Sequence, residues 1–245
     1  MKAEPDKAVL CGFPVNAYDL NHNCEVILKN VLKEQGQWVV TLNLEMIYRS
    51  NADEKYQELL HKADLFIADG VPLLWASHLK KNIRKIAGRS NGTDLVEKLL
   101  RSAIDFKIAV IGGKNPASTV KKYNPGLLKN GYFYDGIVDL NDQVFLAALI
   151  NDLKEHKSNL VFLSLGVPKQ DVLAYKIRKH IPSVTVIGVG GSFDILSGRK
   201  SRAPKWMQKK GLEWFYRLLT EPKRLAKRYM VHYPQALWSL IKDVI

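Results

Sequence analysis

The order of apolar segments along the chain constrains its fold more than any other feature. From Ala8 to about Ile187, short runs rich in β-branched and aromatic residues alternate with longer segments whose apolar residues recur at helical spacing. Because parallel strands need a crossover between them, this alternation predicts an α/β fold with a mainly parallel sheet and helices on both faces. The predicted strands cover residues 8–11, 38–41, 64–68, 107–111, 160–165 and 184–187, and the predicted helices include 21–34, 43–61, 93–103 and 140–154.

The C-terminal part of the chain follows a different pattern and carries most of the charge. Residues 199–228 hold eleven lysines and arginines against Glu213 and Glu221, a net charge of +9 out of +13 for the whole chain. Pro204, Pro222 and Pro234 separate short helical patterns in this region. We therefore predict a Rossmann-like body of residues 1–198 and a basic amphipathic helical appendage of residues 199–245.

Aromatic residues interleave with the cations of the appendage. This composition is typical of helices that lie in a membrane interface with basic residues toward anionic headgroups. It also fits single-stranded nucleic acid binding. The helical pattern broken by prolines, on an enzyme-like body, favours an anionic membrane surface and no nucleic acid. The aromatic residues are Trp206, Trp214, Phe215, Tyr216, Tyr229, Tyr233 and Trp238.

We expect neither a membrane-spanning helix nor a signal peptide. No stretch reaches about 18 uninterrupted apolar residues, and the charged N-terminal residues are not followed by an apolar core. We therefore expect a cytoplasmic protein. Cys11 and Cys24 have no neighbouring Cys or His at metal-ligand spacing, so reduced thiols are expected rather than a disulfide.

Polar and glycine residues follow several predicted strands, at the sheet edge where ligands of α/β proteins bind. Asp69 follows one strand and precedes Gly70, and a partly desolvated carboxylate there can accept a proton from an attacking hydroxyl. A turn or helix-capping aspartate is an equally good interpretation. Thr41 and Asn43 offer hydroxyl and amide groups to a sugar or a diphosphate, although Asn43 also fits a helix cap.

Three further features are compatible with a sugar or phosphate ligand, although each is a weak signal alone. The Gln170 amide can bond sugar hydroxyls, with helix-start polarity as the alternative. The backbone N–H groups of Gly190, Gly191 and Ser192 can approach a phosphate. The Arg89 guanidinium can bind phosphate oxygens in bidentate fashion, although a solvated surface arginine is the default interpretation.

Metal and cofactor motifs are missing from the sequence. The six histidines are scattered, and no Asp-x-Asp, His-Glu-x-x-His or Cys-x-x-Cys appears, so no metal and no cofactor are expected. A departing diphosphate would then be neutralised by arginine, lysine and backbone amides. Gly12 is followed by Phe-Pro-Val-Asn rather than by a dinucleotide-binding glycine pattern, which weakens the hypothesis of an NAD-linked oxidoreductase.

Several short motifs lie along the chain in a fixed order. They are Thr41-Leu-Asn43-Leu-Glu45, Ala68-Asp69-Gly70, Gly92-Thr-Asp-Leu95, Leu165-Gly-Val-Pro-Lys-Gln170, Gly188-Val-Gly-Gly-Ser-Phe-Asp194, Arg202-Ala-Pro-Lys-Trp-Met-Gln, Gly211-Leu-Glu-Trp-Phe-Tyr-Arg-Leu-Leu219 and Glu221-Pro222. In order and spacing, these motifs resemble those of the WecG/TagA/CpsF glycosyltransferases. The resemblance covers nearly the whole chain, and its C-terminal block is highly specific.

The resemblance implies an activity. Members of this family transfer sugars such as N-acetylmannosamine, its uronic acid or glucose from UDP-sugars to undecaprenyl-diphosphate-linked saccharides, inverting the anomeric centre without a metal. It implies a UDP-sugar donor, a polyprenyl-diphosphate-linked acceptor and a place on the inner face of the cell membrane, in cell-envelope or exopolysaccharide biosynthesis. Oligomeric state is left open, with a homo-oligomer as one option. The different-class alternative is a nucleotide-binding or nucleic-acid-binding module with a basic tail.

Site residues are carried over from the family residue by residue. Asp69 is similar to the family's catalytic base and Thr41 to its active-site threonine, while Asn43 and Gln170 match sugar-binding positions. Arg89 matches the family's diphosphate arginine. Arg84 is a rival for that role. In the appendage, Arg217 and Arg224 are similar to arginines that bind the acceptor's diphosphate, and Lys227 stands where another arginine is expected.

Overall fold

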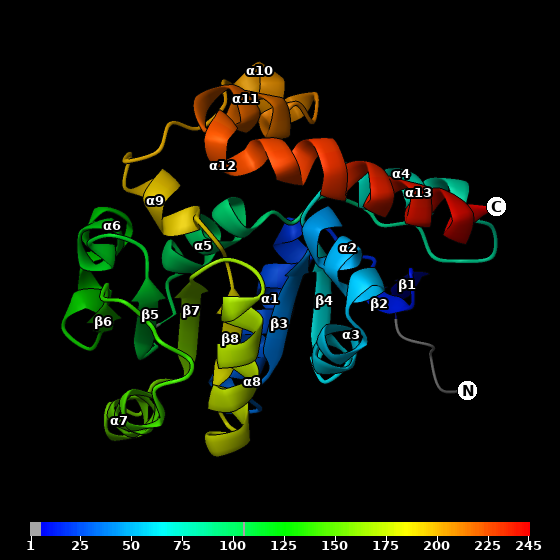
Figure 1. Ribbon diagram of the computed structural model, residues 1–245. Helices are drawn as coiled ribbons and strands as arrows, with labels where there is room; N and C mark the ends of the chain where they lie inside the picture. The colour runs from blue at the N-terminus through cyan, green and yellow to red at the C-terminus, as the bar shows by residue number, and fades with distance from the viewer. Residues whose placement is uncertain (1–5, 105) are drawn as a thin grey trace.

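The computed structural model describes residues 6–104 and 106–245 and contains one eight-stranded sheet (Figure 1). The order of its strands is β1-β2-β4-β3-β8-β7-β5-β6, and every neighbouring pair is parallel except β1 and β2. The predicted α/β class is confirmed. The strands are β1 (Lys7–Leu10), β2 (Phe13–Asn16), β3 (Trp38–Leu42), β4 (Leu65–Ala68), β5 (Ile108–Gly112), β6 (Tyr132–Tyr134), β7 (Leu160–Ser164) and β8 (Thr185–Gly188).

The structure contains two strands that the apolar pattern does not predict. Strand β2 forms an antiparallel hairpin with β1 through a tight turn in which Cys11 and Gly12 both have positive φ, 47° and 81°. The sequence does not predict β2 because Pro14 lies inside it, and proline normally argues against a strand. Strand β6 has only three residues, at the far edge of the sheet, which is too short for a periodic signal.

Helices cover both faces of the sheet because alternate strand residues point to opposite faces. In β3, Trp38 and Val40 belong to one core cluster, and Val39 between them belongs to the other. The first cluster receives apolar residues from α2 (Leu44–Ala52), α3 (Glu54–Leu60), α7 (Gln143–Glu155) and α8 (Lys169–His180). The second receives them from α1 (Leu20–Leu32), α5 (Gly92–Leu100), α6 (Pro116–Tyr123), η1 (Pro125–Leu128) and α9 (Ser192–Leu196).

The helix predicted over residues 43–61 is two helices in the structure. Asp53 ends α2 and caps α3, where its side chain accepts hydrogen bonds from the backbone N–H groups of Lys55 at 3.0 Å and Tyr56 at 3.3 Å. An aspartate that satisfies the first N–H groups of a helix starts a new helix more readily than it continues an old one.

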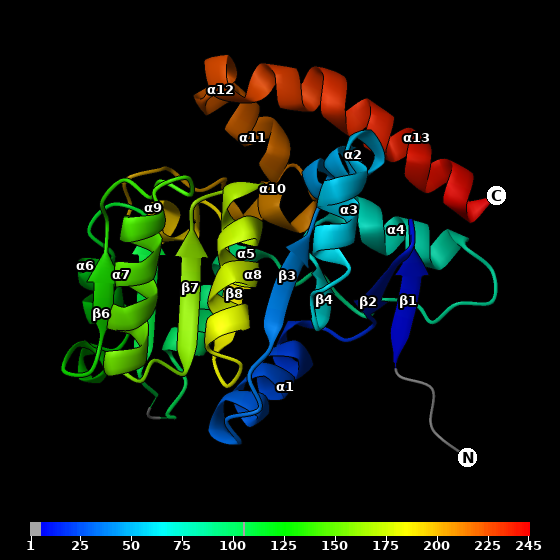
Figure 2. The same cartoon turned by 60° about the horizontal axis from the view of Figure 1, so that its bottom comes forward.

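The appendage lies across the carboxyl ends of the parallel strands. It is at the top of both views (Figure 1 and Figure 2). Its last helix, α13, packs against α2 and against α4 (Val71–Leu79) of the body, and Ala236 and Leu240 are buried in the first core cluster. Within the described residues, no helix is long and apolar enough to cross a membrane. The appendage consists of α10 (Lys205–Lys209), α11 (Glu213–Thr220), α12 (Pro222–Lys227), the π-helical turn η2 (Arg228–His232) and α13 (Tyr233–Val244).

Candidate active site

A cavity of about 880 Å³ lies between the carboxyl ends of the central strands and the appendage. Strands β3 and β8 are neighbours at its centre, and the next strands of the two halves, β4 and β7, lie on opposite sides of them. Ligands of α/β proteins bind beyond the carboxyl ends of the strands, at the place where the strand order reverses direction. Of the predicted site residues, all except Lys227 line this cavity: Asp69, Thr41, Asn43, Arg89, Gln170, Gly190, Gly191, Ser192, Arg217 and Arg224.

Asp69 follows β4 directly and lines the cavity together with arginines of the body and of the appendage. Its backbone N–H donates to the Leu42 carbonyl at 2.9 Å, which holds the end of β4 beside β3. The side chain keeps partial contact with solvent. Burial raises the pKa of Asp69 to about 7, against the opposing charges of Arg217 and Arg89. A carboxyl group that ionises near neutral pH is suited to take a proton from a sugar hydroxyl.

Thr41 and Asn43 are held in place by hydrogen bonds within the protein. The buried Thr41 hydroxyl donates to the Gly188 carbonyl at 2.9 Å and so joins β3 to β8. The Asn43 side-chain oxygen accepts from the N–H groups of Glu45 and Met46, at 3.0 and 3.2 Å, as the N-cap of α2. The capping interpretation of Asn43 is therefore confirmed, and the side chain also lines the cavity.

The glycine turn after β8 is organised around Gln170. The buried Gln170 side-chain oxygen accepts from the Gly190 N–H at 2.9 Å, and the Ser192 N–H donates to the Val189 carbonyl at 3.2 Å. Two of the three N–H groups expected to approach a phosphate are thus bonded inside the protein. A side chain at Gly190 or Gly191 would meet nothing within 4 Å, so this backbone faces open space.

The structure distinguishes the two rival arginines by position. Arg89 lines the cavity, and its Nη1 lies 3.5 Å from Oε2 of Glu213 in the appendage. Arg84 is exposed and pairs with Asp6, outside the residues that line the cavity. Arg89 is therefore the arginine of this pair that can meet a ligand beside Asp69.

Glu213 joins three arginines at the border between body and appendage. Besides Arg89, the buried Glu213 carboxylate pairs with Arg202 Nε at 3.6 Å and Arg217 Nη2 at 3.7 Å. Arg202 also pairs with Asp94 at the start of α5. Guanidinium groups held at fixed positions bind phosphate oxygens with less ordering cost than free side chains. Sequence reasoning did not single out Glu213, because one acid in a basic segment carries no motif of its own.

The appendage supplies Arg228 to the cavity in addition to Arg217 and Arg224. Arg224 lines the cavity while paired with Glu221 at 2.7 Å, whereas Lys227 is exposed and does not line it. Arg228 begins the π-helical turn η2, and its Nη2 donates to the Tyr233 hydroxyl at 2.9 Å. Sequence reasoning missed Arg228 because a π-turn changes the direction in which successive side chains point, and ordinary helical spacing does not predict such a turn.

A second ionic cluster fixes the π-helical turn to the body. His232 Nδ1 pairs with Glu45 Oε2 at 2.9 Å, and Arg49 Nε pairs with Glu45 Oε1 at 2.7 Å. The His232 ring stacks on Tyr48 of α2 with centroids 4.0 Å apart and an angle of 7° between the planes. Because Glu45 lies in the first turn of α2, two residues after the Asn43 cap, the same helix start positions a cavity residue and the turn that carries Arg228.

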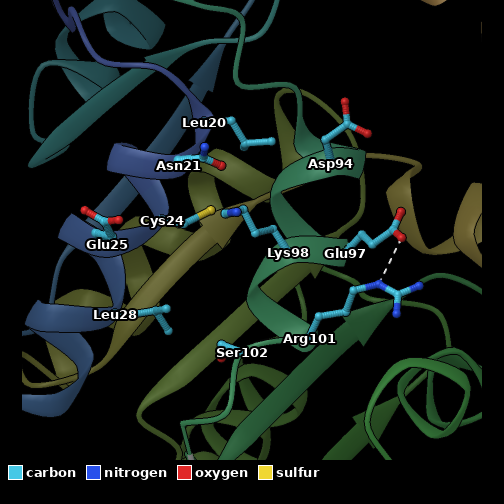
Figure 3. Close-up of a pocket in the computed structure, with 10 residues that line it drawn as sticks. All are labelled: Leu20, Asn21, Cys24, Glu25, Leu28, Asp94, Glu97, Lys98, Arg101 and Ser102. Carbon is cyan, nitrogen blue, oxygen red and sulfur yellow. Dashed lines mark hydrogen bonds and ion pairs between the residues drawn. The ribbon is translucent and has the colours of Figure 1, made fainter.

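A smaller cavity of about 540 Å³ lies between α1 and α5, and Figure 3 shows Cys24 and Lys98 pointing toward one another across it. Burial raises the pKa of the Cys24 thiol to about 12, which makes a thiolate nucleophile there unfavourable. Both cysteines are free, as predicted. Among residues 6–104 and 106–245, no group of three or more His, Cys, Asp and Glu side chains could hold a metal ion.

The chain has relatives among known proteins. The chain is 32% identical over 217 residues to a protein of Bacillus spizizenii (strain ATCC 23059 / NRRL B-14472 / W23), covering 86% of this chain and 80% of the relative. A Bacillus subtilis (strain 168) relative is 30% identical over 215 residues, with coverage of 85% and 80%. A Staphylococcus aureus (strain NCTC 8325 / PS 47) relative is 29% identical over 198 residues, with coverage of 78% and 74%.

All three relatives are named N-acetylglucosaminyldiphosphoundecaprenol N-acetyl-beta-D-mannosaminyltransferase. The model of the glycosyl transferase WecG/TagA/CpsF family matches residues 8–245, nearly the whole chain. This chain therefore belongs to the WecG/TagA/CpsF family of glycosyltransferases.

Proposed function

We propose that this glycosyltransferase moves N-acetylmannosamine from a UDP-sugar to N-acetylglucosaminyl-diphosphoundecaprenol, in the synthesis of a cell-envelope polysaccharide. The names of the relatives support this sugar and this acceptor. The observation that carries the proposal is the placement of Asp69, with a pKa raised by burial to about 7, in one cavity with arginines from the body and the appendage. The uronic acid and glucose donors of the family are the alternatives for the sugar.

The proposed reaction is a single in-line displacement. Asp69 takes the proton of the attacking acceptor hydroxyl while that oxygen forms a bond to the anomeric carbon of the donor sugar. The bond between the anomeric carbon and the UDP oxygen breaks on the opposite side, so the configuration inverts and UDP leaves. Negative charge grows on the diphosphate as the bond breaks, and fixed guanidinium groups stabilise such charge without a metal ion.

The cations divide between two diphosphates. Arg89 comes from the body, as do Asp69 and the glycine turn, and is assigned to the donor diphosphate. Arg217, Arg224 and Arg228 come from the appendage and are assigned to the acceptor diphosphate. The Asn43 and Gln170 amides, already oriented by internal hydrogen bonds, are assigned to sugar hydroxyls.

The proposed place of work is the inner surface of the cell membrane, where a polyprenyl-linked acceptor is embedded. The appendage supports this proposal because it exposes large apolar side chains within the strongly basic segment 199–228 and in the residues that follow it. They are Trp206, Trp214, Phe215, Leu219, Met230, Val231, Leu237, Trp238 and Ile241.

A screen of UDP-sugars for UDP release, with a short-chain prenyl-diphosphate N-acetylglucosamine acceptor, tests the donor and the acceptor together. We expect UDP-N-acetylmannosamine to give release that depends on the acceptor, and a disaccharide whose new linkage has the opposite anomeric configuration to the donor. Release that is unaffected by omitting the acceptor would contradict the proposal. Salt-dependent binding of single-stranded nucleic acid without turnover of any UDP-sugar would support the alternative of a nucleic-acid-binding module.

A further inference from the structure

The cavity has an apolar side that the transfer chemistry does not use. Val71, Pro72 and Trp75 of α4 line it from the body, and Pro234 and Leu237 of α13 line it from the appendage. None of these side chains is charged or titrates near neutral pH, so none can act as the base or form an ion pair with a phosphate. An apolar wall beside a set of arginines is the arrangement expected for a ligand that is part anion and part hydrocarbon.

Helices α4 and α13 pack against one another and lead away from the cavity. The first residues of both helices, Val71 and Tyr233, line the cavity. Just beyond α4 and near the end of α13, Lys80 and Asp243 form an ion pair with 2.8 Å between Nζ and Oδ1. The two helices therefore run side by side in the same direction, from the cavity outward.

Large apolar side chains on this helix pair are open to water. Trp75 and Leu79, one turn apart on α4, are 62% and 71% exposed, and Leu237 and Ile241, one turn apart on α13, are 37% and 47% exposed. Trp75 and Leu237 also line the cavity, so the exposed side chains continue its apolar wall. We call these four residues the α4–α13 strip. Exposed apolar side chains that extend the wall of a cavity in this way are typical of an interaction site.

We propose that the α4–α13 strip binds the first isoprene units of the lipid acceptor, an inference that rests on the proposed function. The strip is continuous with the cavity in which Arg217, Arg224 and Arg228 are assigned to the acceptor diphosphate. The hydrocarbon attached to that diphosphate has to leave the cavity, and the strip gives it an apolar path. Tyr233 to Ile241 span roughly 12 Å along α13, at 1.5 Å per residue.

Trp75 and Leu79 distinguish binding of the isoprene chain by the strip from general binding of the protein to a bilayer. Both belong to the body, outside the basic segment 199–228 that supplies attraction to anionic headgroups. Trp75 forms part of the cavity wall, where it can contact a chain that leaves the diphosphate site. Trp206 of the appendage has a similar exposure, 57%, but does not line the cavity. It provides a matched control.

The test measures KM for soluble acceptors in the absence of detergent micelles and vesicles. The acceptors are N-acetylglucosamine diphosphates that carry one, two or three isoprene units. We expect KM to fall roughly tenfold or more from one to three units, because each buried CH₂ group strengthens binding by about fourfold, equivalent to about 0.8 kcal/mol. In Trp75→Ala the fall should shrink to less than about threefold, whereas Trp206→Ala should keep the wild-type dependence.

Each outcome decides one point. If wild-type protein releases UDP but its KM does not depend on chain length, the strip does not bind the lipid, although the transferase function stands. If a chain-length effect appears only after vesicles are added, the strip docks on a bilayer and the proposal is overturned. If no acceptor of any length supports UDP release, the proposed function itself fails.

Discussion

Asp69 owes its expected role to a balance of charges around a partly desolvated carboxyl group. Burial raises its pKa to about 7, Arg217 and Arg89 oppose that rise, and Glu213 adds to it. Because the base must be ionised, kcat/KM should increase with pH up to about 7 and then level off. In Glu213→Gln this rise should move to lower pH, since removal of a neighbouring negative charge favours the ionised form.

The pH profile of initial rates, measured at low donor concentration, checks this prediction. Arg217→Gln provides the opposite shift, because loss of its positive charge raises the pKa of Asp69 further. A profile that is unchanged in both variants would show that another group controls ionisation.

The same carboxyl group should make the fold less stable as the pH rises. Its pKa is about 7 in the folded protein against a model value of 3.8, so between these values the folded state binds more protons than the unfolded state. The free energy of unfolding contributed by this group therefore falls as the pH rises from about 4 to about 7. Asp69→Asn removes the effect and should be more stable than wild type at pH 8, by on the order of 1 kcal/mol or more.

Urea unfolding at pH 5 and pH 8 measures this difference. The burial-raised carboxyl of Asp171, which accepts from Tyr56 at 2.7 Å, shifts stability in the same direction, but it is present in both proteins and cancels from the comparison. An Asp69→Asn variant that is less stable than wild type at pH 8 would mean that Asp69 is a structural aspartate.

The π-helical turn η2 decides which basic residue of the run 227–228 faces the cavity. The motif resemblance places Lys227 at the third acceptor-binding position, whereas in the structure Lys227 is exposed and Arg228 lines the cavity. Arg228→Ala should lower kcat/KM for the acceptor by roughly 10- to 100-fold, because a hydrogen bond to a charged group contributes about 1.5–3 kcal/mol. Lys227→Ala should change it by less than about threefold.

Steady-state kinetics with acceptor varied at saturating donor test this prediction. Lys227→Ala is the matched control, since it removes one positive charge at the neighbouring position. If the two variants lose activity equally, the general charge of the segment matters and the position of the guanidinium does not.

The sequence predicts the helices and strands that have a long buried face. It does not predict the strand or the helix break whose position depends on one turn or one capping residue. Strand β3 is apolar along most of its length because both of its faces are covered, and this apolar run predicts the strand. The hairpin partner β2 depends on the left-handed turn at Cys11 and Gly12, and its Pro14 argues locally against a strand. The break at Asp53 is likewise a single capping residue within a continuous helical pattern.

Local patterns predict the part of the candidate site whose residues follow strands, whereas the family resemblance supplied Arg217 and Arg224 and supported Arg89. Asp69, Thr41 and Gln170 lie near the ends of β4, β3 and β7, so the topology of a parallel sheet brings them to one edge. Arg228 and Trp75 enter the same cavity through contacts between the appendage and the body, far apart in the sequence. Local patterns hold no information about which exposed helix residue such a contact turns inward.

In the whole molecule, the appendage lines one side of the cavity. It also carries the basic residues and the exposed apolar side chains that are proposed to contact the membrane. Leu219→Glu combined with Met230→Glu should weaken binding to vesicles that contain anionic lipid by at least tenfold, because both side chains are exposed large hydrophobics. The measurement is co-sedimentation with anionic and with zwitterionic vesicles at two salt concentrations.

A matched control lies on the body, where Val144 of α7 is also an exposed large hydrophobic residue. Val144→Glu adds a charge of the same sign and should leave vesicle binding unchanged. Wild-type binding should be stronger to anionic vesicles and should weaken with salt. Equal binding to zwitterionic vesicles at high salt would contradict a role for the net charge of +9 in residues 199–228.

The central claim is that Asp69 removes the acceptor proton in a sugar transfer completed by arginines of both parts. The most direct measurement compares wild type and Asp69→Asn for disaccharide-lipid formation from UDP-N-acetylmannosamine and a prenyl-diphosphate N-acetylglucosamine, with both proteins shown to be folded. We expect Asp69→Asn to lower kcat by roughly 10²–10⁴ with little change in donor KM. Transfer by Asp69→Asn at the wild-type rate would contradict the central claim.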